Sequence, residues 1–159
     1  DRVARELPWA RFAVAGRPPL SWPGVAVEPP EKLLSQAAVA VVASGTATLE
    51  AALSGLPQLV IYKVSPFTFW LGRQLVKIPH LAMPNVLTRE EIVPEFLQER
   101  CSADLLAPAL IDLLSTPERQ EKMRSDYLRM RALLGQKNAA AEAARQIWQG
   151  VVRGSACVG

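Results

Sequence analysis

The sequence has few of the residues that hold metals or crosslink small secreted folds. Its cysteines are Cys101 and Cys157, and His80 is the single histidine among 159 residues. Two cysteines are too few for a disulfide framework, and no second cysteine or histidine lies at metal-ligand spacing. We therefore expect no metal and no cofactor, and a reducing cytoplasm suits the chain. A lone histidine is more often a surface or packing residue than a catalytic one.

Long apolar runs and clustered charge are also missing. No run approaches the ~18 residues of a membrane-spanning helix, and the start has no signal-peptide pattern. The net charge is only +3, with basic and acidic residues interspersed. A nucleic-acid surface needs a clustered basic face, so we expect no nucleic-acid partner. Half of the residues are hydrophobic and 21% are charged, which is typical of a globular protein.

Strand-like and helix-like segments alternate, which predicts an α/β fold with a parallel sheet. Prolines 79 and 84 predict an extended segment over 80–87. The opening DRVARELPWA is typical of the end of a helix, so we expect further chain before it. Without repeats or a low-complexity linker, residues 1–159 are expected to form one domain, with C-terminal helices from about residue 102. The predicted strands are 11–15, 24–27, 38–42 and 58–62, and the predicted helices are 31–36, 46–54, 67–77, 103–114, 117–134 and 139–152.

The stretch ASGTATLEAALSGLP follows directly on the predicted buried strand 38–42. In open parallel sheets, ligands bind beyond the carboxyl ends of strands, where backbone N–H groups and the helix dipole favour phosphate. Gly45 would let a phosphate approach the main chain, and the hydroxyls of Ser44 and Thr46 could donate to it. Glu50 lies one turn further along and could accept hydrogen bonds from a ribose diol. A plainer interpretation stays open, in which Ser44 only caps the helix and Glu50 is solvated.

The segment FTFWLGRQLVK has apolar residues at helical spacing with basic residues between them. Phe67 and Trp70 would lie on its apolar side, with Arg73 and Lys77 interleaved. One interpretation is a core helix whose basic side chains reach solvent. The other is a helix that lies on an anionic membrane surface. The residues alone leave both open.

The stretch SGTATLEAALSGLPQLVIYKVSPFTFWLGRQLVKIPHLAMPNVL, followed by REEIVPEFLQ, resembles the C-terminal half of lipid-A-disaccharide synthases. The resemblance covers about 43–98 and rests on SGTATLE, YKVSP, LVKIP, PN and VPEFLQ occurring in that order. It implies a glycosyltransferase-B architecture, in which two Rossmann-like domains face each other and the second binds the UDP-sugar. The implied reaction transfers 2,3-diacylglucosamine from UDP to 2,3-diacylglucosamine 1-phosphate, giving a β-1,6 disaccharide and UDP.

The resemblance also implies roles for individual residues. The loop Ser44–Thr46 would hold the diphosphate and Glu50 the uridine ribose, and Thr48 is also expected among the substrate-binding residues. The remaining residues implied to line the donor cleft are Tyr62, Lys63, Asn85 and Gln98. The family's arginine-bearing loop, first strand and acceptor domain with its general base are expected before this chain. We therefore predict no catalytic residue here and name that N-terminal half as a partner.

Two consequences of the resemblance concern the surroundings of the enzyme, and one residue departs from the family. The acyl chains of donor and acceptor favour the membrane-surface interpretation of Phe67, Trp70, Arg73 and Lys77. The expected location is cytoplasmic, peripheral at the inner membrane of a Gram-negative-type bacterium. His80 departs from the family, which often has an aromatic residue there.

Two other classes of function remain as alternatives. Transferases and 2-epimerases that use UDP-N-acetylglucosamine share a small-residue loop, a helix and a ribose-binding glutamate. The YKVSP and FTFWLGRQLVK segments argue against them. A non-catalytic membrane-surface or protein-interaction module is the second alternative, and such a module should not respond to UDP.

Overall fold

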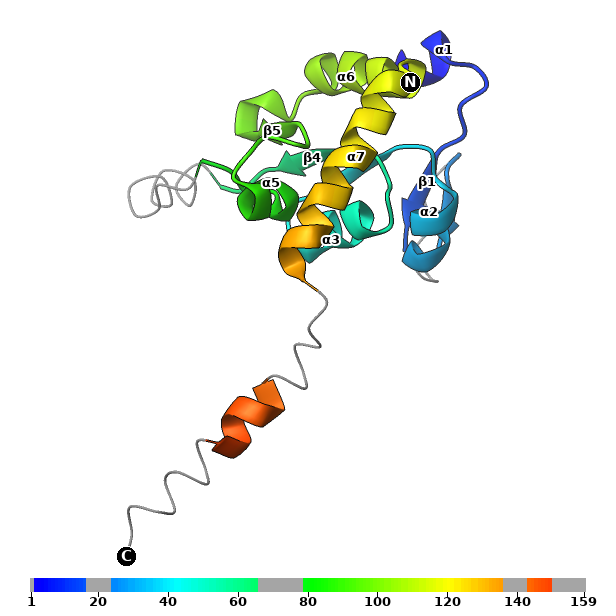
Figure 1. Cartoon of the computed structure of the whole chain (residues 1–159). Helices are drawn as coiled ribbons and strands as arrows, with labels where there is room; N and C mark the ends of the chain where they lie inside the picture. The colour runs from blue at the N-terminus through cyan, green and yellow to red at the C-terminus, as the bar shows by residue number, and fades with distance from the viewer. Residues whose placement is uncertain (1, 17–23, 66–78, 136–142, 150–159) are drawn as a thin grey trace, which may run out of the picture.

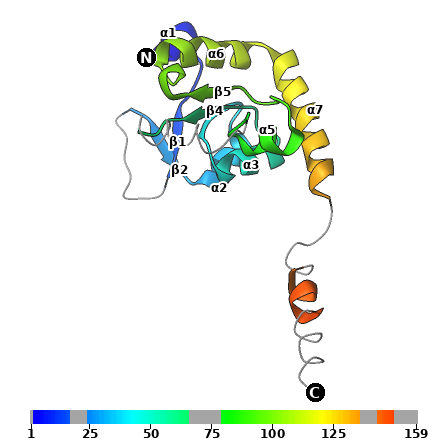
Figure 2. The same cartoon turned by 90° about the vertical axis from the view of Figure 1, so that its left-hand side faces the viewer.

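The computed structural model describes residues 2–16, 24–65, 79–135 and 143–149. Within these ranges the strands are all parallel and form a two-stranded sheet, β1–β2, and a three-stranded sheet in the order β3–β4–β5. Helices flank the sheets (Figures 1 and 2). This confirms the predicted α/β class with a Rossmann-like parallel arrangement. The strands are β1 Ala13–Ala15, β2 Ala26–Glu28, β3 Ala40–Ala43, β4 Gln58–Tyr62 and β5 Glu95–Leu97.

Helix α1 precedes β1, and the other helices connect successive strands or follow the last one. A short helix over 143–149 comes after the elements that pack around the sheet (Figure 1). The helices are α1 Arg2–Glu6, α2 Pro30–Gln36, α3 Thr46–Leu53, α5 Met83–Thr88, the 3₁₀ turn η1 Gln98–Arg100, α6 Ala103–Ser115 and α7 Pro117–Leu134.

The core lies between the β3–β4–β5 sheet and the helices that pack against it. Strand β4 is central, and Leu59 and Val60 are almost completely buried. Such a continuous apolar run is typical of a parallel strand that is covered on both faces. Helix α7 contributes Met123, Tyr127 and Met130, which recur at helical spacing and enter the same cluster. Helices α3, α5 and α7 contact one another, so the helix that follows the Gly45 loop is packed against two others.

Several predicted boundaries agree with the structure. Strand β4 occupies the predicted residues 58–62. Gly55 has φ 74° just after α3, as expected for a glycine that ends a helix in the left-handed region. Helix α7 begins at Pro117 and stops before Gly135, whose φ is 70°. Proline at the start and glycine at the end therefore defined this helix correctly.

The extended segment predicted over 80–87 is wrong. Met83–Thr88 forms helix α5, with Pro84 in its first turn. A first-turn N–H has no partner within the helix, so proline costs nothing there and its fixed φ suits the helix. The short strand β5 and the turn η1 were not predicted at all. The predicted helix 67–77 lies outside the described residues, and of the predicted helix 139–152 the structure describes 143–149 as helical.

In the part of the chain that the structure describes, none of the helices combines the length and the apolar character that crossing a membrane requires.

Candidate functional site

The carboxyl ends of β3, β4 and β5 meet at one edge of the sheet. The register pairs Ala43 with Ile61 and Tyr62 with Leu97. The Ser44 N–H continues this pairing by donating to the Ile61 carbonyl over 2.8 Å. The residues that follow each strand are therefore neighbours, although they are far apart in the sequence. This edge is where parallel α/β sheets bind ligands.

The loop between β3 and α3 has a backbone conformation that requires glycine. Gly45 has φ 145° and ψ −162°, a region that other residues almost never adopt. An added Cβ would meet nothing within 4 Å, so the constraint is backbone strain and the space beside Gly45 is open. No side chain caps α3; the Thr48 N–H donates to the Gly45 carbonyl over 3.2 Å, while the N–H groups of Thr46 and Ala47, at the start of the helix, have no partner within it. The loop thus offers accessible backbone donors at the positive end of a helix dipole.

Two hydroxyls of this region are used to hold the loop in place. Ser44 Oγ donates to the Leu81 carbonyl over 3.0 Å. Thr48 is completely buried, and its Oγ1 donates to the Gly45 carbonyl over 2.7 Å and accepts from the Met83 N–H over 3.3 Å. Both hydroxyl protons are therefore directed at the protein. Of the hydroxyls of Ser44 and Thr46, which were predicted to contact phosphate, that of Thr46 is on an exposed residue.

The charged residues predicted for the site are exposed. Glu50 lies on α3 one turn beyond Thr46, and its carboxylate has no ion pair or hydrogen bond with any residue that the structure describes. Lys63 follows the end of β4 and is exposed, next to the partly buried Tyr62. Glu50 on α3 and Lys63 just beyond β4 are therefore exposed charged residues on the segments that follow two neighbouring strands.

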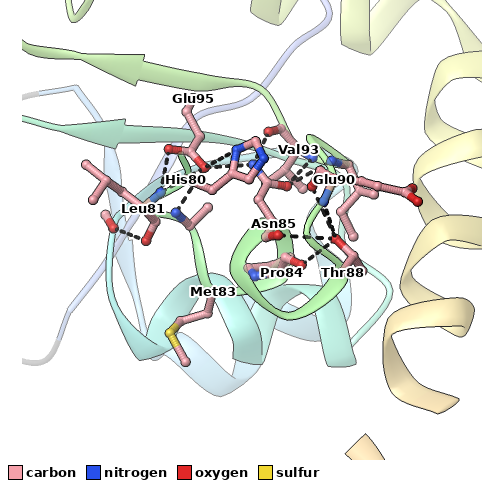
Figure 3. A network of polar contacts seen from close by, with 12 residues as sticks. His80, Leu81, Met83, Pro84, Asn85, Thr88, Glu90, Val93 and Glu95 are labelled. Atoms are coloured by element: carbon pink, nitrogen blue, oxygen red, sulfur yellow. Dashed lines mark hydrogen bonds and ion pairs between the residues drawn. The ribbon is translucent and has the colours of Figure 1, made fainter. Parts of the chain in front are cut away.

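Asn85 is completely buried and fully hydrogen-bonded within the chain. Its Nδ2 donates to the Val93 carbonyl and to Glu95 Oε1, over 2.8 and 2.7 Å. Its Oδ1 accepts from the N–H groups of Ile92 and Val93, over 2.8 and 2.9 Å. Figure 3 shows this amide between α5 and the segment that leads into β5. The side chain thus holds these two segments together.

Gln98, just beyond β5, also joins two segments through its side-chain amide. It is 6% exposed and has a positive φ of 49°, which is uncommon outside glycine. Its Oε1 accepts from the Val64 N–H over 2.8 Å, and its Nε2 donates to the Val64 carbonyl over 3.0 Å. The side chain therefore pairs with the backbone as a neighbouring strand would. It fixes the chain where it leaves β4, just beyond Tyr62 and Lys63.

The structure adds one residue that the sequence reasoning missed. Glu95 is 8% exposed, and its carboxylate accepts from the N–H groups of Leu81 and Ala82 as well as from Asn85. His80 Nδ1 lies 3.9 Å from Glu95 Oε1. The signal was present in the sequence, since a glutamate inside the apolar run VPEFL must find partners when it is buried.

The four remaining predicted residues, Phe67, Trp70, Arg73 and Lys77, lie outside the described ranges. Among the residues that the structure does describe, no group of three or more histidine, cysteine, aspartate or glutamate side chains could hold a metal ion. Among the described residues, the candidate site offers backbone N–H groups, the Thr46 hydroxyl and the exposed residues Glu50 and Lys63.

Comparison with known proteins adds a family match. A family model described as lipid-A-disaccharide synthetase matches residues 28–149. The lipid-A-disaccharide synthase of Gloeothece citriformis is 39% identical over 116 residues, which is 72% of this chain and 30% of that protein. The corresponding protein of Sulfurihydrogenibium sp. is 38% identical over 119 residues, covering 75% and 31%. That of Alkalilimnicola ehrlichii is 35% identical over 167 residues, covering 90% and 43%. The chain thus spans between 30% and 43% of the length of these relatives.

Proposed function

Because the chain belongs to the lipid-A-disaccharide synthetase family, we propose that it is the donor-binding half of a glycosyltransferase-B enzyme of lipid A biosynthesis. The proposed reaction transfers 2,3-diacylglucosamine from UDP to 2,3-diacylglucosamine 1-phosphate. The products are the β-1,6 disaccharide and UDP. Residues 1–159 act as one UDP-sugar-binding domain, and the general base belongs to the N-terminal half of the two-domain architecture. That half is the proposed protein partner.

The observation that carries this proposal is the Gly45 loop at the carboxyl edge of the sheet. Its glycine-only backbone, open surroundings and uncapped helix start favour a diphosphate close to the main chain. Glu50 stands one turn along the same helix, at a suitable separation for the ribose that a diphosphate carries. Its carboxylate can accept from both hydroxyls of the diol. Lys63 supplies positive charge at the neighbouring strand end.

The predicted site residues divide into two groups by whether a side-chain hydrogen bond within the protein holds them. We assign direct contact with the donor to the accessible ones, which are Gly45, Thr46, Glu50, Tyr62 and Lys63. The others have their hydrogen-bonding side chains bonded within the protein, and we assign them the task of holding the first group in place. These are Ser44, Thr48, Asn85 and Gln98.

We further propose that the segment 67–77 lies on an anionic membrane surface. Both proposed substrates carry acyl chains, so the enzyme must meet them at a membrane, here the cytoplasmic side of the inner membrane. Phe67 and Trp70 would enter the headgroup boundary, while Arg73 and Lys77 meet lipid phosphates. Vesicle co-sedimentation of the chain should fall with added salt and when Phe67 and Trp70 become serine. Binding that ignores both changes would contradict the membrane role.

The donor-binding function is tested by adding UDP or uridine to the chain during thermal unfolding. At a ligand concentration ~100-fold above Kd, a ligand that binds only the folded state stabilises it by about 2.7 kcal/mol. We expect UDP to raise Tm at concentrations where uridine does not, because uridine lacks the diphosphate. Equal or absent responses to the two ligands would contradict the proposal. An absent response would instead favour the interaction module.

A further inference from the structure

We propose that Glu95 is a positioning residue for the donor diphosphate, an inference that rests on the proposed function. Glu95 does not reach the edge of the sheet itself. Its buried carboxylate accepts from the Leu81 N–H over 2.9 Å, the Ala82 N–H over 3.0 Å and Asn85 Nδ2 over 2.7 Å. A carboxylate is purely an acceptor, so it suits a place where three N–H donors converge. Figure 3 shows Glu95 directed at the Leu81 segment.

The segment that Glu95 holds also holds the Gly45 loop at two places. The Leu81 carbonyl accepts from Ser44 Oγ, immediately before Gly45. The Met83 N–H donates to Thr48 Oγ1, which in turn donates to the Gly45 carbonyl. The segment Leu81–Met83, called here the strap, therefore lies between the Glu95 carboxylate and the loop. Every link between them is a hydrogen bond of 3.3 Å or less.

The rare backbone conformation of Gly45 explains why the loop needs to be held by the strap. A residue in such a rare region of φ and ψ persists only where its surroundings hold it there. Donors that are already aimed at an anion need no reorganisation when it binds, and they lose this advantage if the loop relaxes. The strap is the part of the surroundings that bonds to both sides of Gly45, and Glu95 with Asn85 fixes the strap. Loss of the Glu95 charge should thus loosen the loop.

A purely structural role for Glu95 makes a different prediction. If the carboxylate only stabilised the fold, its loss would lower the fraction of folded protein and reduce the binding of every ligand equally. A positioning role concerns the loop that contacts phosphate, so it should affect UDP and spare uridine. Glu50, which we assign to the ribose, lies on helix α3, outside the strap. Comparing the two ligands on folded protein therefore separates the two roles.

The test is calorimetric titration of Glu95→Gln with UDP and with uridine. Glutamine keeps the shape of the side chain but removes its charge and places an NH₂ group where an oxygen accepts the Leu81 N–H. We expect the UDP affinity to fall about tenfold, the usual scale for one charge-assisted hydrogen bond, with uridine affinity unchanged within about twofold. The matched control is Glu90→Gln, which neutralises a nearby but exposed glutamate paired with Arg129. It should leave both affinities unchanged.

A double-mutant cycle tests whether Glu95 acts through the strap. Ser44→Ala removes one of the two links between the strap and the loop, so Glu95→Gln should weaken UDP binding less in that background than alone. Additive effects, or an equal loss of UDP and uridine affinity in Glu95→Gln, would overturn the positioning role. If the unmodified chain fails to bind UDP, the proposed function itself falls. If it binds UDP and Glu95→Gln binds UDP equally well, only the present inference falls.

A second measurement needs no substitution and covers the case in which Glu95→Gln does not fold. Amide hydrogen exchange of Leu81 and Ala82 reports how firmly the carboxylate holds the strap. Saturating UDP should slow the exchange of both amides in the unmodified chain, while saturating uridine should not. Exchange at these two positions that does not respond to UDP would overturn the inference.

Discussion

Two regions packed on the three-stranded sheet are stabilised by different interactions. They are the Gly45 loop with its strap, called here the loop side, and helix α7, called the α7 side. Around Gly45, side chains bond to backbone groups of another segment, as Ser44 does with Leu81 and Thr48 with Met83. Helix α7 instead inserts apolar residues into the core. Hydrogen bonds of the first kind fix direction and add modest stability, whereas apolar burial adds stability without fixing direction. Hydrogen bonds therefore set the direction of the chain around the Gly45 loop, whereas α7 contributes mainly apolar burial.

Ion pairs lie on the outer surface of helix α7. Asp126 is buried beneath Lys122 and Arg129, at 2.7 and 2.8 Å, and Arg129 continues to Glu90 at 3.0 Å. Burial alone would raise the pKa of Asp126, but the hydrogen bonds from Lys122 and Arg129 outweigh it and lower the pKa. The basic partners are largely exposed, so this cluster adds little to the stability that the core supplies.

The largest expected effect is on stability and comes from the α7 side. Met130→Ala removes a completely buried side chain and should lower the free energy of unfolding by about 2–5 kcal/mol. Leu128→Ala is the matched control, because Leu128 lies on the same helix but is 69% exposed, and it should change stability by less than about 0.5 kcal/mol. Urea denaturation measures both. At a temperature where Met130→Ala is folded, its UDP affinity should equal that of the unmodified chain. A lost affinity would show that the two sides are not separate.

The next effect is on binding and comes from the loop side. Gly45→Val would force a branched residue into a glycine-only conformation and close the open space beside the backbone. UDP affinity should fall about a hundredfold or more, and uridine affinity much less. Gly135→Val is the control, since Gly135 also has positive φ and open space but ends α7. It should cost stability and leave UDP affinity on folded protein unchanged. Equal losses of the two ligands in Gly45→Val would mean that the loop acts through folding.

Glu50→Ala should produce a smaller loss with a different pattern. Removal of a charged hydrogen-bond partner costs about 1.5–3 kcal/mol, or roughly ten- to a hundredfold in affinity. Because UDP and uridine share the ribose, both should weaken, in contrast to Gly45→Val. Glu91→Ala, which removes another exposed glutamate, is the control. Calorimetry that finds unchanged UDP affinity in folded Glu50→Ala protein would remove the ribose assignment.

Sequence patterns predicted the elements whose signals are local. Strand β4 and helix α7 were correct because an apolar run, a first-turn proline and a final glycine each act over a few residues. Helix α5 was missed because Pro84 is compatible with a first turn as well as with an extended chain. Strand β5 has only three residues and depends on pairing with β4, which no local pattern reveals.

For the candidate site, the sequence suggested which residues to consider but not how their side chains are bonded in the folded chain. Sequence position grouped Ser44, Gly45 and Thr46 as equivalent phosphate contacts. The structure separates them, because Ser44 bonds to Leu81, thirty-seven positions along the chain. The family resemblance pointed to Asn85, whereas Glu95 was not considered, although the two side chains bond to each other. Their roles follow from partners that converge only in the folded chain.

The smallest expected effect concerns acid stability on the α7 side. The pKa of Asp126 in the folded chain lies below its ordinary value of 3.8. Its charge therefore adds stability above that value, and this stability is lost as the pH falls through the folded pKa. Asp126→Asn should lower the free energy of unfolding at neutral pH by about 1 kcal/mol, since both partners are solvent-exposed and screened. Urea denaturation of the two proteins should show this difference in the free energy of unfolding shrinking below pH ~4.

UDP affinity at neutral pH should be the same for both proteins, because the Gly45 loop makes no bond to this cluster. A difference that stays constant into acid would show that Asp126 stabilises α7 by packing and not by charge.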